Sequence, residues 1–175
     1  MSVRRLNHAV LYVRNVSRSV DFYREMLGFE IATEIPGRAA FLRAKGTSND
    51  HDLGLFQIDD GEPSGSGMSA GAGGRPRVGL YHLAWEVGTL RELAETARRL
   101  AAGGALVGAS DHRVSKSLYA KDPDGIEFEV MWRVPAEDWD SERQTGEMIA
   151  PLDLGAELAR WGDDLVTGAA AGSAT

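Results

Sequence analysis

Cysteine is absent from the 175 residues of this sequence. Its absence excludes disulfide bridges, thiolate metal ligands and a cysteine nucleophile. Histidine is scarce as well, with four in the whole chain. Chemistry that needs an imidazole group can therefore fall on only a few positions.

Long apolar runs and basic clusters are also missing. No run reaches the ~20 residues that span a membrane, and the N-terminal stretch has no signal-peptide core. The 19 Lys and Arg residues are outnumbered by 26 Asp and Glu residues, which gives a net charge of −7. Such a chain is a poor partner for nucleic acid or anionic membranes. We therefore expect a cytoplasmic protein with neither partner.

An internal repeat organises what is present. Residues 6–13 and 80–87 both have the composition of strands, and each carries a histidine near its start, His8 and His82. A helical pattern follows each of them. Short strands are then indicated near residues 29–33, 39–44 and 52–58 in the first half, and near 105–107, 117–121 and 126–132 in the second. The order β-α-β-β-β occurs twice, so we predict an α+β fold of two related modules.

Capping residues mark the two helices. Ser17 can cap the first helix, and Gly28 is a natural stop. Thr89 and Glu92 form a capping box at the start of the second helix. These signals indicate where each helix of the repeat begins and ends.

The repeat also sets the predicted domain boundaries. We place one domain at residues 1–133, composed of module one (3–58), a linker (59–77) and module two (78–133), with an extension at 134–175. The linker is rich in glycine and serine and is expected to be flexible. In the extension, Leu154, Leu158 and Trp161 suggest one short helix, and the tail from Gly168 is expected to be disordered.

Two histidines and one carboxylate are the candidate metal ligands. Residues 126–132 follow the turn Asp122–Gly125 and alternate apolar and polar, which places Glu129 opposite the apolar face. A carboxylate facing inward is costly unless something positive meets it. If the modules are related by symmetry, His8, His82 and Glu129 can converge inside a cupped mixed sheet. Two histidines and one carboxylate with open positions are typical of non-haem Fe(II) oxygenases.

Residues 3–133 resemble the vicinal-oxygen-chelate superfamily of glyoxalases, bleomycin- and fosfomycin-resistance proteins and type I extradiol dioxygenases. The repeat, the turn Asp122–Gly125 and Glu129 carry this resemblance. It implies two βαβββ modules, each supplying half of a cupped sheet around a metal.

A more specific motif resembles the extradiol signature. It consists of His112, then Leu118 with Tyr119, Asp122 with Pro123, Gly125 and Glu129, and it departs from the usual pattern at Ser110. Upstream, His51 begins a His-Asp-Leu-Gly-Leu segment similar to the one that carries the acid–base histidine of that family, with Gly54 in place of alanine.

The resemblance implies a ring-cleaving dioxygenase acting on an aromatic diol with O2. Its metal would be Fe(II), with Mn(II) as a possible substitute, held by His8, His82 and Glu129. It implies that His51 transfers a proton and that His112 and Tyr119 hydrogen-bond the substrate oxygens. Many relatives are dimers, so we expect a homodimer.

Two other functions remain open for a chain of this resemblance. A glyoxalase-like isomerase or lyase usually has a fourth protein ligand on the last strand of module one, where Gln57 stands only at the strand end. A non-catalytic protein that sequesters a drug would lack the metal triad, which this chain keeps. Arg43 and Arg113 could bind a substrate carboxylate, but we interpret them as solvated surface cations, and Glu127 as a rim carboxylate.

Overall fold

The computed structural model describes residues 2–3, 5–58 and 79–168. Two compact units divide the chain: unit 1 comprises residues 1–65 with Asp122–Gly125, and unit 2 comprises residues 66–121 with 126–175. The predicted linker lies outside the described residues, as does the predicted tail beyond Gly168. No helix within the described ranges is long and apolar enough to cross a membrane.

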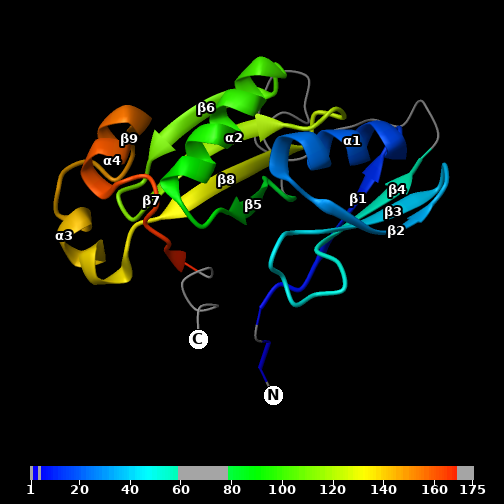
Figure 1. Cartoon of the computed structure of the whole chain (residues 1–175), viewed down its shortest axis with the longest axis horizontal. Coiled ribbons are helices and arrows are strands. Elements are labelled where there is room, and N and C mark those ends of the chain that lie inside the picture. The colour runs from blue at the N-terminus through cyan, green and yellow to red at the C-terminus, as the bar shows by residue number, and fades with distance from the viewer. Residues whose placement is uncertain (1, 4, 59–78, 169–175) are drawn as a thin grey trace. The chain divides into compact units, whose positions relative to one another are not determined.

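Unit 1 contains one helix against a four-stranded sheet (Figure 1). Its elements are β1 (Ala9–Val13), α1 (Val16–Leu27), β2 (Glu30–Ile35), β3 (Ala39–Arg43) and β4 (Leu53–Gln57). The strand order is β1-β4-β3-β2, with β1 and β4 parallel and the other pairs antiparallel. The alternation predicted for the first strand is confirmed, because Leu11 and Val13 are buried while Val10 and Tyr12 are exposed.

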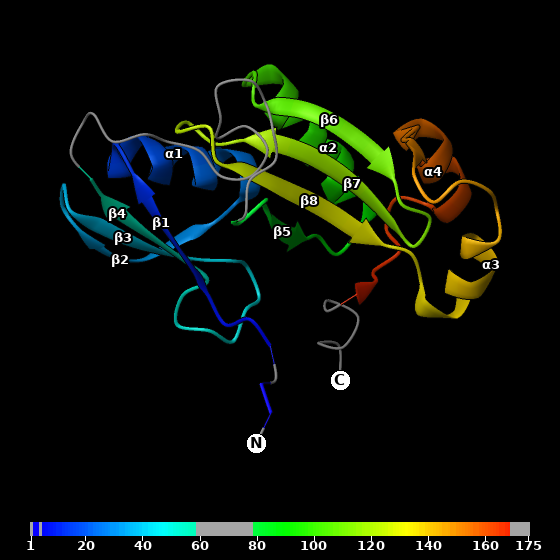
Figure 2. The same cartoon turned by 180° about the vertical axis from the view of Figure 1, so that it is seen from behind.

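Unit 2 repeats this order. It contains β5 (Leu83–Glu86), α2 (Leu90–Ala102), β6 (Leu106–Asp111), β7 (Ser115–Lys121) and β8 (Glu127–Arg133). Strands β5 and β8 are parallel, like β1 and β4. Helix α2 packs against one face of this sheet, in contact with β6, β7 and β8. Figure 2 shows the sheet from the opposite side. The predicted α+β fold of two βαβββ modules is confirmed.

The helix termini follow the capping signals with one exception. Helix α1 is capped by Asn15, whose side chain accepts a hydrogen bond from the Arg18 N–H, so the prediction of Ser17 was wrong. Asn15 has the extended backbone of an N-cap, whereas Ser17 already lies inside the helix. Gly28 ends α1 with a left-handed φ of 74°. The capping box at Thr89 is confirmed.

The extension after β8 holds more structure than the one predicted helix. That helix is α4 (Leu154–Trp161), and before it come a 3₁₀ turn (Ala136–Asp138), α3 (Trp139–Arg143) and β9 (Ala150–Pro151). Strand β9 pairs antiparallel with the end of β6, so the sheet order is β5-β8-β7-β6-β9. A two-residue strand is too short to carry a periodic signal, which explains why the sequence did not reveal it.

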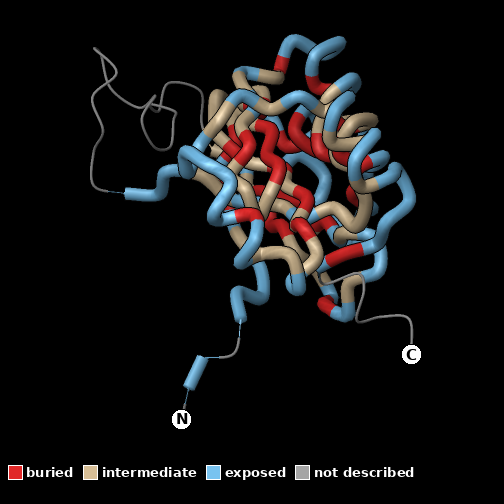
Figure 3. Tube along the Cα trace, turned by 90° about the vertical axis from the view of Figure 1, so that its left-hand side faces the viewer, coloured by how far each residue is buried: buried red, intermediate tan, exposed pale blue. Residues whose placement is uncertain are grey.

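The core of each unit is built from the inward faces of its strands and helix. Figure 3 colours the buried stretches red, and buried residues recur along β3, β4, β7 and β8. In β8, Phe128, Val130 and Trp132 are buried while Glu127 and Glu129 are half-buried, so the predicted alternation is confirmed. The turn Asp122–Gly125 belongs to unit 1, where Asp122 accepts a hydrogen bond from the Tyr23 hydroxyl at 3.2 Å. Burial, followed by the Asp122 charge, raises the pKa of Tyr23 well above its ordinary value.

Candidate active site and metal ligands

His82 and Glu129 form a close pair in unit 2. His82 lies just before β5, and Glu129 lies on β8, the parallel neighbour in which Ala84 pairs with Glu129. The His82 Nε2 is 3.0 Å from the Glu129 Oε2, and the side chains are 22% and 13% exposed. Both residues were predicted from the sequence as metal ligands, and the fold of unit 2 brings the two side chains together.

The chemistry of this pair fits a metal such as Fe(II) or Mn(II). Imidazole and carboxylate are suitable ligands for both. The two donor atoms lie 3.0 Å apart, so both could face one ion. The His82 Nδ1 is buried and has no hydrogen-bond partner among the described residues, so no protein contact at Nδ1 orients the ring from that side.

His112 and Tyr119 form a second pair in the same unit. His112 lies in the turn between β6 and β7, and its Nε2 is 2.6 Å from the Tyr119 hydroxyl. Tyr119 pairs in register with Glu129, and its ring centroid is 5.9 Å from that of His82. Four of the six predicted site residues therefore lie together in unit 2.

Tyr81 is an aromatic neighbour of this group that the sequence did not single out. Its ring centroid lies 4.5 Å from that of His82. Its position directly before a candidate ligand was the only available signal. Burial raises the pKa of Tyr119 to about 12, with further contributions from Glu129 and Tyr81. The Tyr119 phenol therefore keeps its proton at neutral pH and can donate it in a hydrogen bond.

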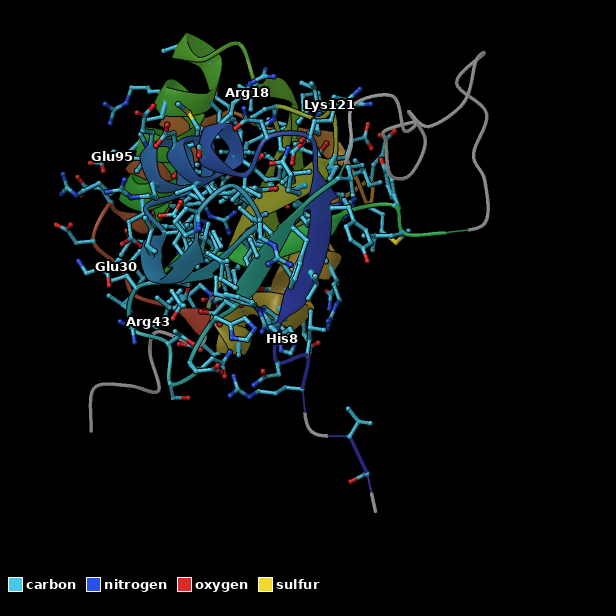
Figure 4. The ribbon with its side chains drawn as sticks, turned by 90° about the vertical axis from the view of Figure 1, so that its right-hand side faces the viewer. His8, Arg18, Glu30, Arg43, Glu95 and Lys121 are labelled. Carbon is cyan, nitrogen blue, oxygen red and sulfur yellow. The ribbon has the colours of Figure 1, made fainter. Side chains whose placement is uncertain are left out.

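Unit 1 brings its two histidines together. His8 lies at the start of β1 (Figure 4), and His51 lies before the parallel strand β4. Their ring centroids are 4.6 Å apart. The Phe41 ring packs edge-on against His51 at 5.1 Å. The same parallel pairing that joins His82 to Glu129 in unit 2 thus joins His8 to His51 in unit 1.

Polar neighbours hold one nitrogen of each ring. His8 Nδ1 lies 2.9 Å from Asn7 Oδ1, and His51 Nδ1 lies 2.8 Å from Asp50 Oδ2. The hydrogen bond with His51 lowers the pKa of Asp50. A carboxylate on Nδ1 orients the ring and leaves Nε2 to meet a metal or a substrate. Neither Asn7 nor Asp50 was predicted as a site residue.

No group of three or more His, Asp or Glu side chains in the described part of the chain lies so as to hold a metal ion. The geometry brings together His82 with Glu129 in unit 2, and His8 with His51 in unit 1. Membership of His8 in a common ligand set with His82 and Glu129 rests on the sequence repeat and stays a prediction.

The other polar residues considered as ligands or substrate-binding groups contact other parts of the protein. The Gln57 amide accepts from the Val16 N–H at 2.9 Å and donates to the Arg14 carbonyl. Arg43 is exposed and lies 3.9 Å from Glu30 (Figure 4). The interpretation of Arg113 as a solvated cation was wrong, because its side chain is 17% exposed and its Nε donates to the Glu147 carbonyl at 2.6 Å. The sequence did not predict that the C-terminal extension, which contains Glu147, would lie against Arg113.

The backbone directly after His112 is strained. Arg113 has a φ of 68°, and it alone among the described non-glycine residues has a positive φ. The Val114 N–H donates to the His112 carbonyl at 2.9 Å, which closes a γ-turn centred on Arg113. A non-glycine residue in this region costs roughly 1–3 kcal/mol and persists only where its surroundings enforce it.

Comparison with known proteins supplies the family. The model of the Glyoxalase/Bleomycin resistance protein/Dioxygenase superfamily matches residues 5–130. A catechol-2,3-dioxygenase of Bacillus subtilis (strain 168) is 29% identical over 164 residues, covering 93% of this chain and 54% of that protein. A metapyrocatechase 2 of Cupriavidus necator is 30% identical over 101 residues, covering 58% of this chain and 26% of that protein.

Both curated relatives are longer than this chain, which spans about half of the first and a quarter of the second. Among solved structures, a glyoxylase/bleomycin resistance protein/dioxygenase domain from Frankia sp. EAN1pec aligns with a TM-score of 0.61 at 23% identity. The alignment covers 80% of this chain and 99% of that one. The fold and the family model agree: this chain belongs to the Glyoxalase/Bleomycin resistance protein/Dioxygenase superfamily.

Proposed function

We propose that this protein is an Fe(II)-dependent extradiol dioxygenase that cleaves a catechol-type aromatic diol with O2. The observation that carries the proposal is the group in unit 2, in which the His82–Glu129 pair lies beside the hydrogen-bonded His112 and Tyr119. In the reaction, the ring carbon–carbon bond beside the diol breaks. Both atoms of O2 enter the product, which carries an aldehyde and a carboxylic acid.

The proposed metal ligands are His8, His82 and Glu129. When bound, Fe(II) would act as a Lewis acid toward the diol and supply electron density to O2. His82 and Glu129 support the proposal through their donor atoms 3.0 Å apart. His8 joins them because it precedes β1 as His82 precedes β5.

The other site residues handle protons and hydrogen bonds. His51 is proposed to donate and accept a proton at Nε2, since Asp50 holds its Nδ1. An imidazole suits this role because its pKa lies near the working pH. Tyr119, which keeps its proton at neutral pH, and His112 would hydrogen-bond the substrate oxygens and the charge that develops on them.

A glyoxalase-like isomerase or lyase is the competing activity. It would need a further metal ligand from β4. Gln57, the polar residue at the end of that strand, already uses its side-chain amide in hydrogen bonds with the backbone of Arg14 and Val16. That contact disfavours the competitor. The proposed homodimer and the aromatic substrate are supported by the family resemblance.

Anaerobic loading with Fe(II), followed by O2 uptake against a panel of catechols, tests the proposal. We expect about one Fe(II) per chain and a yellow ring-cleavage product. Glu129→Gln should lose tight iron binding, because one of three ligands is removed. Glu127→Gln is the matched control, since Glu127 lies two residues away on the same face of β8 and is paired with Lys121 at 3.7 Å. Stoichiometric iron in Glu129→Gln, or iron without O2 uptake for any catechol in the wild type, would reject it.

A further inference from the structure

The strained turn that carries His112 is held by one carboxylate. Asp111, the last residue of β6, accepts a hydrogen bond from the Arg113 N–H at 2.7 Å. Its other oxygen lies 3.6 Å from the Arg113 guanidinium. These contacts span the residue whose φ is 68°. Asp111 therefore braces the backbone on both sides of His112, which lies between Asp111 and Arg113.

A fully buried lysine fixes Asp111 in turn. Lys116 has no exposed side-chain surface, and its Nζ donates to Asp111 Oδ1 at 2.7 Å. A buried ammonium is very costly unless it is paired and hydrogen-bonded. The second partner is Glu157 of α4, whose Oε2 lies 3.4 Å from Nζ and also accepts from the Trp161 indole N–H at 2.9 Å. Two cations, Arg113 and Lys116, thus face two carboxylates.

The extension contacts the turn at two further points. The Glu147 carbonyl accepts from Arg113 Nε at 2.6 Å. Strand β9 pairs with the end of β6, so that Ala150 lies opposite Asp111. All of these residues lie in unit 2. The segment after β8 therefore reaches the His112 turn through a side chain, a carbonyl group and a strand.

We propose that Asp111 is the positioning residue that aims the His112 imidazole at Tyr119, held by Lys116 and Arg113, which the extension contacts in turn through Glu157 and the Glu147 carbonyl. Within the described ranges, the Asp111 carboxylate contacts Arg113 and Lys116 and neither a proposed metal ligand nor the Tyr119 hydroxyl, so it acts through the backbone of His112. The inference rests on the proposed function and deepens it, because His112 and Tyr119, whose Nε2 and hydroxyl are 2.6 Å apart, are both assigned there to the substrate oxygens.

The His112–Tyr119 hydrogen bond can be measured without activity. Nitrogen-15 NMR of the histidine side chains in the metal-free protein reports it at Nε2, and with four histidines the His112 signal is assigned by its loss in His112→Gln. We expect Asp111→Asn to lose or broaden the hydrogen-bonded signal, because asparagine cannot neutralise Lys116. Asp140→Asn is the control, since Asp140 is 93% exposed in the same extension, and it should leave the signal unchanged.

A second variant separates positioning from folding. Asp111→Asn with Lys116→Met removes the buried lysine together with its Asp111 partner. Glu157 keeps the hydrogen bond from the Trp161 indole N–H, and Arg113 keeps the Glu147 carbonyl, so the unit should fold. The turn would still lose its anionic brace, and the His112 signal should change as in the single variant. A folded single or double variant that keeps the wild-type signal overturns the proposal. So does failure of both variants to fold, since the pair would then serve the whole unit.

Kinetics supply the second readout. With Fe(II) and a catechol, Asp111→Asn should lower kcat by up to roughly 10²-fold, the size of effect that a misplaced group produces. Iron content and KM should stay near the wild-type values, because no ligand is changed. An equal rise in KM with unchanged kcat would contradict a role through His112. If the wild type cleaves no catechol, the proposed function fails, while the NMR experiment still decides the role of Asp111.

Discussion

His51 and His8 lie side by side in unit 1, yet their proposed roles differ. His8 is a proposed metal ligand, and His51 is the proposed proton-transfer group. His51→Phe should still bind iron and catechol, because His51 is an acid–base group in this scheme. Its ring-cleavage rate should fall by roughly 10²–10⁴, the usual contribution of a positioned proton-transfer group. Iron analysis beside stopped-flow product formation checks both expectations. Phenylalanine keeps a ring against Phe41, so packing is disturbed little.

His8→Phe is the paired variant. We expect it to lose iron, and added Fe(II) should not restore turnover, since an incomplete ligand set binds weakly. If His51→Phe loses iron as well, His51 is a ligand and the proposed triad is incorrect. If it keeps both iron and full rate, His51 has a structural role.

Alternation along a strand was enough to predict which side chains share a face. It placed Glu129 opposite Phe128 and Val130, and the structure agrees. Contacts made by the backbone could not be predicted in this way. The positive φ of Arg113 depends on the carboxylate of Asp111 and on an extension more than 30 residues further along the chain.

In helix α1, too, the side-chain pattern could be predicted from the sequence, whereas the contact that caps the backbone could not. Its apolar spacing and Gly28 predicted the helix, but Asn15 provides the cap where Ser17 was expected. Asn15→Ala should lower the free energy of unfolding by about 1 kcal/mol, because the Arg18 N–H loses its acceptor. Ser17→Ala is the control and should change stability little, since Ser17 is exposed and alanine favours helix. Urea unfolding of both variants decides which residue is the cap.

The stability of the β6–β7 hairpin should depend on pH through the ionisation of Asp111. Burial acts to raise the pKa of Asp111, but hydrogen bonds from Lys116 and the Arg113 N–H outweigh it and leave the pKa below its ordinary value. A lowered folded-state pKa stabilises the fold above the unfolded value of about 3.9. This stability is lost as the pH falls through the folded-state pKa.

Wild type should therefore exceed Asp111→Asn in free energy of unfolding at pH 7, and the gap should narrow progressively below about pH 4. Urea titrations at several pH values measure it. A gap that stays constant down to pH 2 would mean that the charge of Asp111 does not stabilise the hairpin.

For the whole molecule, the repeat was the most informative feature of the sequence. It predicted two βαβββ modules, and both sheets have a parallel pair formed by their first and last module strands. The extension carries no repeat, so its strand and its contacts with Asp111 and Lys116 could be found only in three dimensions.

Metal binding should protect strands in both halves of the chain from hydrogen exchange. If His8, His82 and Glu129 bind one ion, the metal binds the folded state and adds stability of about 2.7 kcal/mol at a hundredfold excess over Kd. Hydrogen exchange should then slow in β1 of unit 1 as well as in β5 and β8 of unit 2 when Mn(II), which does not require anaerobic handling, is added. In His8→Ala the protection of β1 should disappear. Protection confined to β5 and β8 in the wild type would mean that His82 and Glu129 bind the metal without His8. His112→Gln is the control, because His112 is not a proposed ligand, and it should retain the full pattern.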